Sequence, residues 1–128
     1  MGSNIEYRFD GSVTEPAVVT AIRIPMVNNQ YAQIKAFATC GDQIGDAGSG
    51  GFADYYAFAK AYCEAGAISI DNFYDIITDG YTTGILELSA TGQVAKVNIY
   101  CPFGAGKTAK WALRVSVDYV DNVFRILT

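Results

Sequence analysis

The feature that constrains the fold most is a two-residue alternation near the C-terminal end of the chain. Large apolar side chains occupy every second position from 111 to 119, and small or charged residues lie between them. The apolar set is Trp111, Leu113, Val115, Val117 and Tyr119, and the other set is Ala112, Arg114, Ser116 and Asp118. Because successive side chains of a strand point to opposite faces, the pattern predicts a strand with one face in a core.

Other segments also favour strands, because they alternate or are rich in β-branched residues. These segments are 6–9, 18–24, 31–40, 85–89, 94–100 and 123–127. Thr91-Gly92 lies between two of them and predicts a hairpin turn. The C-terminal third of the chain is therefore expected to be a run of antiparallel strands.

The middle of the chain favours helices. An Ala-rich stretch ends at Gly66, a residue type that commonly follows a helix, and its larger residues share one helical stripe. The stripe consists of Phe52, Tyr55, Tyr56, Ala59, Tyr62 and Cys63. We therefore expect the main helix at about 52–65. A second short helix is expected at about 69–79, with Asp71, Asp75 and Asp79 on one face and four apolar residues on the opposite face. The open alternative is an all-β fold in which residues 70–80 form a strand.

These elements predict an α+β fold, in which a mostly antiparallel sheet carries the main helix and the second short one packed on it. The chain has 128 residues and a mass of 13.8 kDa, the size of one domain, and no linker or repeat divides it. A single domain over 1–128 is expected.

The chain contains no histidine, which removes Ser-His-Asp and Cys-His catalysis and the commonest general base. Its three cysteines, Cys40, Cys63 and Cys101, form no CxxC pair, so zinc sites built on Cys and His spacing are excluded. We interpret the cysteines as small buried apolar residues, and we expect no cofactor.

The net charge is −4 and the isoelectric point is about 4.6, which argues against binding to nucleic acid or to an anionic membrane. No run of 18 apolar residues is present, so no membrane span is expected. The N-terminal residues lack the pattern of a signal peptide, and synthesis in a cytosol is the expectation.

Residues 104–108 read GAGKT, which resembles the end of a phosphate-binding loop. The full motif needs a glycine where Cys101 stands, and it needs a helix after the lysine. The alternating strand that follows argues against that helix. We interpret the segment as a hairpin loop in which Gly104 and Gly106 adopt positive φ, and not as the site of a P-loop NTPase.

The acidic residues admit a second interpretation as cation sites. Asp42 and Asp46 in a glycine-rich loop, and the three aspartates of the second helix, have oxygen ligands that a cation accepts. They lack the spacing of an EF-hand loop, so solvated surfaces explain both groups, and we expect no metal.

The charges are unevenly distributed along the chain. Residues 41–87 hold eight acids and only Lys60 as a base, whereas residues 88–128 hold five bases and two acids. A domain with an acidic side and a basic hairpin side is complementary to a copy of itself. The alternative is that these charges interleave in the fold.

We therefore expect a non-catalytic structural protein that assembles as a homo-oligomer, the general character of small virion components such as phage tail, connector or head-decoration proteins. The expected interface residues are Tyr55, Phe58, Phe103, Lys107, Lys110, Asp71, Asp75 and Asp79. One alternative is a module that binds a different protein. The other is a small-molecule-binding domain or a histidine-free enzyme with an aromatic pocket between helix and sheet, in which Asp54 and Tyr56 would act together in catalysis.

Overall fold

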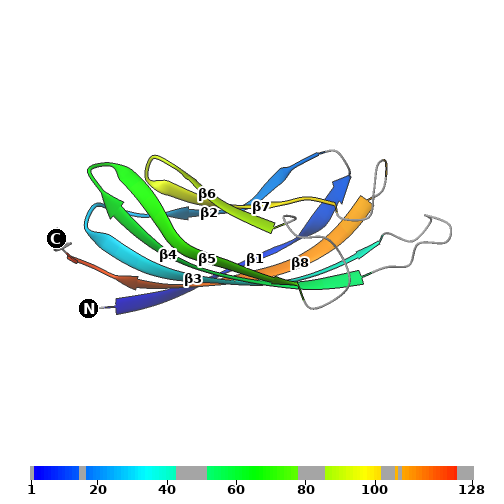
Figure 1. The fold of residues 1–128 in the computed structure, drawn as a ribbon, viewed down its shortest axis with the longest axis horizontal. Coiled ribbons are helices and arrows are strands. Elements are labelled where there is room, and N and C mark those ends of the chain that lie inside the picture. Colours follow the sequence, from blue (N-terminus) through cyan, green and yellow to red (C-terminus); the bar gives the residue numbers. More distant parts are fainter. Residues whose placement is uncertain are drawn as a thin grey trace.

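A computed structural model describes residues 2–14, 17–42, 52–77, 86–101, 106 and 108–123. This part of the chain contains eight strands (Figure 1). They are β1 (Gly2–Thr14), β2 (Val19–Pro25), β3 (Gln30–Asp42), β4 (Phe52–Glu64), β5 (Ala67–Ile77), β6 (Leu86–Thr91), β7 (Val94–Ile99) and β8 (Thr108–Val120). No helix occurs in the described ranges, and hence none there has the length and hydropathy to cross a membrane.

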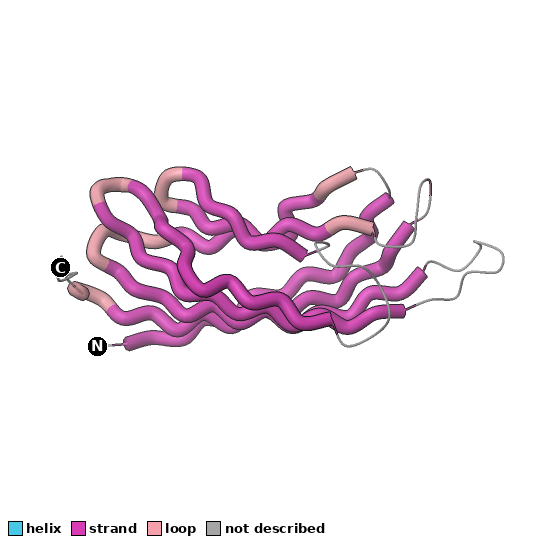
Figure 2. Tube along the Cα trace, in the orientation of Figure 1, coloured by secondary structure: helices cyan, strands magenta, loops and turns pink. Residues whose placement is uncertain are grey.

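The strands form two antiparallel sheets that are stacked as two layers (Figure 2). The larger sheet has five strands in the order β1-β8-β3-β4-β5, and the smaller sheet has three in the order β2-β7-β6. The expected strands over 6–9, 18–24, 31–40 and 111–119 are confirmed. The expected hairpin is confirmed too, but its two turn residues are Gly92 and Gln93, because Thr91 is the last residue of β6 and pairs with Val94 of β7.

The predicted α+β fold is wrong, since the described part of the chain is all-β. The segment predicted as the main helix over 52–65 is strand β4, and the segment predicted as a second helix over 69–79 lies largely in β5. The open alternative, a strand in the second segment, therefore holds for its described residues. The predicted packing of helices on a sheet is replaced by two sheets packed face to face.

The reason lies in a second period that the same residues satisfy. In β4, the small residues Ala57, Ala59 and Ala61 alternate with Tyr56, Phe58 and Lys60, and only the alanines are fully buried. Aromatic residues favour strands, whereas alanine favours helices, so local preference alone does not decide between the two. Twelve register partners on β3 satisfy the backbone of β4 in the sheet.

The core lies between the two sheets and consists of one cluster of apolar side chains. Its layer on the larger sheet is rich in alanine, since Ala36 of β3 lies opposite Ala57 of β4 and Ala32 lies opposite Ala61. The smaller sheet supplies larger buried side chains, namely Ile22, Ile24, Leu86, Val97 and Ile99. All three cysteines are buried and none of them forms a disulfide within the described part of the chain, as the sequence predicts. Among the described side chains, no polar or charged residue is fully buried.

Two residues with positive φ make the tight turn between β4 and β5. Ala65 has φ of 51° and Gly66 has φ of 78°, and Glu64 pairs with Ala67 across them. Positive φ at both central residues defines the turn whose twist matches a hairpin. Gly66 therefore lies in a hairpin turn between two strands, and its expected role at the end of a helix is wrong.

The chain is anchored where it leaves β8. The Tyr62 hydroxyl donates a hydrogen bond of 2.7 Å to the carbonyl oxygen of Val123, and the Val123 amide donates one of 2.8 Å to the carbonyl of Asn29. Gln30 also donates a bond of 2.8 Å to the carboxylate of Asp121. These contacts hold the end of β8 against the turn before β3.

Candidate functional site

The outer face of the three-stranded sheet, which points away from the core, is a polar surface. Asn98 of β7 accepts a hydrogen bond from Thr20 of β2 and donates to Ser89 of β6. The Tyr100 hydroxyl donates to Glu87 at 3.3 Å. Burial raises the pKa of the Tyr100 hydroxyl, and the negative charge of Glu87 raises it further. This face has the composition that is usual for a sheet surface in water.

The outer face of the five-stranded sheet is different because it carries aromatic side chains. They are Tyr31 and Phe37 of β3 and Tyr56, Phe58 and Tyr62 of β4, and the register places them on one face. Phe37 is 39% exposed, and three of the others are half-buried. Tyr62 is buried, in keeping with its bond to Val123.

Four long side chains form a row across this face, which we call the ridge. Strand pairing places Arg8 of β1 opposite Arg114 of β8, Arg114 opposite Phe37 of β3, and Phe37 opposite Tyr56 of β4. The ring centroids of Phe37 and Tyr56 are 4.9 Å apart at an angle of 58°, and the Arg114 guanidinium carbon lies 5.4 Å from the Phe37 centroid. The ridge thus has a cationic end and an aromatic end.

The neighbouring row consists of short side chains, and we call it the furrow. It is made of Asp10, Ala112, Thr39 and Asp54, each two residues along its strand from a ridge residue. Ridge and furrow together line a depression of about 480 Å³. Within the furrow, the Thr39 hydroxyl donates a hydrogen bond of 2.9 Å to Asp54.

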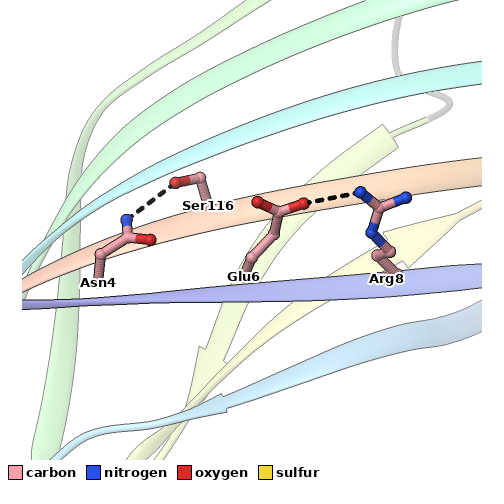
Figure 3. A network of polar contacts seen from close by, with 4 residues as sticks. All are labelled: Asn4, Glu6, Arg8 and Ser116. Carbon is pink, nitrogen blue, oxygen red and sulfur yellow. Dashed lines mark hydrogen bonds and ion pairs between the residues drawn. The ribbon is translucent and has the colours of Figure 1, made fainter.

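The two arginines of the ridge turn to different partners. Arg8 donates to the Glu6 carboxylate at 3.2 Å along its own strand (Figure 3), whereas Arg114 lies against Phe37 on the other side. Asn4 of β1 donates a hydrogen bond to Ser116 of β8 on the same face. The Arg8 side chain is 72% exposed, and the pair to Glu6 is therefore a weak contact that solvent screens.

The structure places the predicted interface residues in different environments. Tyr55 is only 3% exposed and stacks on Trp111 with centroids 5.5 Å apart, so its side chain belongs to the core, contrary to the expectation of an exposed ring. Phe58 is half-buried on the aromatic outer face, and Lys110 is exposed on the same face of β8. Phe103, Lys107 and Asp79 lie outside the described residues.

Asp71 and Asp75 do not share a helix face, because both lie in a strand. The register places Asp71 opposite Lys60 and Asp75 opposite Ala57. A base on β4 thus lies beside an acid on β5, and Asp10 lies beside Arg8 and Arg114. On the described part of the outer face, acidic and basic side chains therefore lie next to each other. This is the alternative that the sequence left open, and it differs from a domain with one acidic side and one basic side.

The residues expected for the alternative function do come together on one surface. Asp54 and Tyr56 both line the depression, on the same face of β4. The depression lies on an outer face, however, and not in the predicted cleft between a helix and a sheet. The expected loop around Asp46 lies outside the described residues. Among the described side chains, no three Cys, Asp or Glu residues are placed to hold a metal ion.

Sequence reasoning missed the ridge and furrow because they join residues from four strands. The sequence offers one signal for them, and it concerns single strands. The two-residue alternation places Phe37 on the solvent side of β3 and Arg114 on the solvent side of β8, where a large side chain is available to form a surface. The GAGKT segment is described only at Gly106, which has the expected positive φ of 76°, and at Thr108, which begins β8.

No family model and no curated protein matches this sequence. Two solved structures show a distant similarity. One is the tailspike protein gp49 of Acinetobacter baumannii bacteriophage Fri1, described as a capsular polysaccharide depolymerase, with 14% identity, a TM-score of 0.46, and coverage of 95% of this chain and 18% of that one. The other is the tailspike protein of A. baumannii phage AM24, with 11% identity, a TM-score of 0.44, and coverage of 93% and 26%.

The chain thus spans about a fifth and about a quarter of the two tailspikes to which it is similar. Both are phage proteins, and the expected virion setting agrees with them only at that coarse level. At these TM-scores the similarity carries no argument about function, so the proposals below depend on the geometry of this chain.

Proposed function

We propose that the chain is a non-catalytic structural protein that assembles with copies of itself through the outer face of the five-stranded sheet. The aromatic side chains of that face carry the proposal. An antiparallel sheet usually presents polar side chains to water, but this one presents Phe37, Tyr56 and Phe58. Apolar patches of this kind mark interaction sites.

The β1 edge of the sheet is less suited to assembly than its face. Glu6, Arg8 and Asp10 are exposed on the edge strand β1, and charges on an edge oppose pairing with a further strand. The face is large enough for a stable contact. Five strands about 4.8 Å apart, with up to 13 residues at about 3.4 Å each, span roughly 800 Å², the area that one partner buries in a standard interface.

A phage particle is the setting that we propose for this assembly. Small virion subunits need a stable fold and a contact surface and no catalytic groups, which agrees with the absence of histidine and the low content of charge. The tailspike similarities name the same kind of particle, but the proposal does not depend on them.

The molar mass in solution tests the proposal, measured by size-exclusion chromatography with light scattering over a range of concentrations. We expect a multiple of 13.8 kDa at high concentration. Phe37→Asp should weaken association at least about tenfold, since burying one phenylalanine stabilises by about 1.5–3 kcal/mol. Val27→Asp is the matched control, because Val27 is 60% exposed but lies in a turn off the face.

Two results would contradict this function. A mass of 13.8 kDa at every concentration would rule out self-association, and equal effects of Phe37→Asp and Val27→Asp would place the contact elsewhere.

A second candidate is a binding site for a small molecule in the depression. The observation that favours it is the volume of about 480 Å³ lined by charged groups of both signs and by aromatic rings. A monomeric protein whose Phe37 and Tyr56 resonances shift on titration with a small ligand would favour this function over assembly.

A further inference from the structure

We infer that two copies of the chain pack face to face about a two-fold axis that runs parallel to the ridge, midway between ridge and furrow. The inference rests on the proposed self-assembly and adds its geometry. The ridge of one copy then fills the furrow of the other, and Arg8 of each copy meets Asp10 of its partner.

The ridge and the furrow are complementary in shape. The ridge holds only long side chains and the adjacent furrow only short ones, and the two rows follow the same four strands in the same order. Successive residues on one face of a strand are about 7 Å apart, so the rows are parallel and closely spaced. A rotation of 180° about an axis between them exchanges the rows while leaving the position along each row unchanged.

Each large residue then lies over a small one. On this rotation Arg114 faces Ala112 of the second copy, and Phe37 faces Thr39. At the edge of the sheet, the β1 strands of the two copies run antiparallel over each other, with Arg8 of each copy over Asp10 of the other. Such an isologous contact closes after two copies and uses this face of both.

The ridge and the furrow are also complementary in charge at the β1 edge of the sheet. Arg8 and Arg114 are register partners, and like charges directly opposite on neighbouring strands are destabilising in one copy. Asp10 makes no hydrogen bond or ion pair with the described part of its own chain. In the dimer the cationic end of each ridge meets the Asp10 carboxylate of the other copy's furrow, so both unfavourable features of the single copy are relieved.

The charges of the furrow disfavour a two-fold axis in the other direction. A two-fold axis parallel to the strands would place the Asp10 end of one furrow over the Asp54 end of the other, with like charges facing. Of these two axes, the one parallel to the rows brings opposite charges and complementary sizes together at once.

A charge-exchange experiment tests the inference. Arg8→Glu alone places two carboxylates together at both contacts, and Asp10→Arg alone places two guanidinium groups together. We expect each variant to lose at least about tenfold in self-association. In an equimolar mixture, the new glutamate of one chain meets the new arginine of the other, and the native Asp10 meets the native Arg8. Dimers should therefore return as heterodimers.

The readout is light scattering of each variant and of the mixture, with one chain carrying a mass tag so that heterodimers can be counted. The double variant Arg8→Glu/Asp10→Arg should also dimerise with itself. Arg23→Glu serves as the control, since Arg23 is an exposed charge on the other sheet and its replacement should leave association unchanged.

The possible results separate the inference from the function on which it rests. If the wild type associates but Arg8→Glu associates equally well, or if the mixture stays monomeric, the two-fold geometry is overturned while self-assembly stands. If the wild type is monomeric at all concentrations, both fail. If both single variants lose self-association and dimers form again only when the two variants are mixed, the result supports the two-fold geometry.

Discussion

Arg8 and Arg114 lie directly opposite each other on neighbouring antiparallel strands, and their side chains turn away to Glu6 and Phe37. Each guanidinium group thereby gains a favourable partner while leaving a depression beside the pair. A cross-strand pair of like charges weakens a sheet, so its presence on an exposed face favours a role outside the fold of one copy.

The first prediction concerns this pair. Arg8→Glu should change the free energy of unfolding of the monomer by less than about 1 kcal/mol, because relief of the repulsion offsets the loss of an exposed ion pair. Urea unfolding followed by Trp111 fluorescence at low protein concentration measures the change. A larger loss would mean that Arg8 stabilises the fold of the single copy.

The second prediction concerns the anchor at the end of β8. Tyr62→Phe removes the hydrogen bond to Val123 and should lower the free energy of unfolding by about 1 kcal/mol. Tyr31→Phe is the matched control, since Tyr31 lies opposite Tyr62 on the same face and its hydroxyl has no partner in the described part of the chain. Equal losses in the two variants would show that the Val123 bond contributes nothing.

The third prediction concerns the alanine layer of the core. Ala36→Leu adds volume at a position with no exposed surface and should destabilise the protein by about 1–3 kcal/mol. Ala67→Leu, at an exposed position of β5, should be close to neutral. Chemical denaturation of both variants measures the difference, and a neutral Ala36→Leu would reveal unfilled space between the sheets.

The fourth prediction concerns the turn at Ala65, which has positive φ without being glycine. Ala65→Asn should stabilise the protein by about 0.5–1 kcal/mol, because asparagine tolerates this conformation and Asn-Gly is the preferred pair in such turns. Ala65→Val should destabilise it. Thermal melting of the two variants provides the test, and a higher midpoint for Val than for Asn would refute the turn geometry.

The fifth prediction concerns alkaline pH. Burial, and then the hydrogen bond with Tyr7, raise the pKa of the Tyr119 hydroxyl above its ordinary value of 10.0. The unfolded chain therefore releases this proton first as the pH rises. The contribution of Tyr119 is fully present below about pH 10 and decreases above it by up to about 1.4 kcal/mol per pH unit.

Urea unfolding between about pH 8 and pH 11 measures this dependence. Tyr119→Phe loses the bond to Pro25 and should be less stable than the wild type at the lower end of this range, but its stability should fall less steeply at the upper end. Parallel curves for the two proteins would assign the alkaline loss to other groups.

The strand from Val19 to Pro25 could be predicted from its β-branched residues, and the strand from Thr108 to Val120 from its two-residue period. The hairpin between β6 and β7 could be predicted from the glycine at position 92, which lies in its turn. The exclusions drawn from the missing histidine likewise needed only the residue count. In these stretches the local preference and the final environment agree.

The conformation of residues 52–77 was decided only by tertiary structure. Alanine and aromatic residues there satisfy a helical stripe and a strand alternation equally well, and pairing with β3 selects the strand by satisfying the backbone and burying the alanines. The ridge and furrow depend on tertiary structure even more strictly. Arg8, Phe37, Tyr56 and Arg114 are far apart in the chain, and only the register of four strands brings them into one row. A local pattern determines which residues face outward, but it carries no information on which strands lie side by side, because that choice depends on the free energy of the whole packed core.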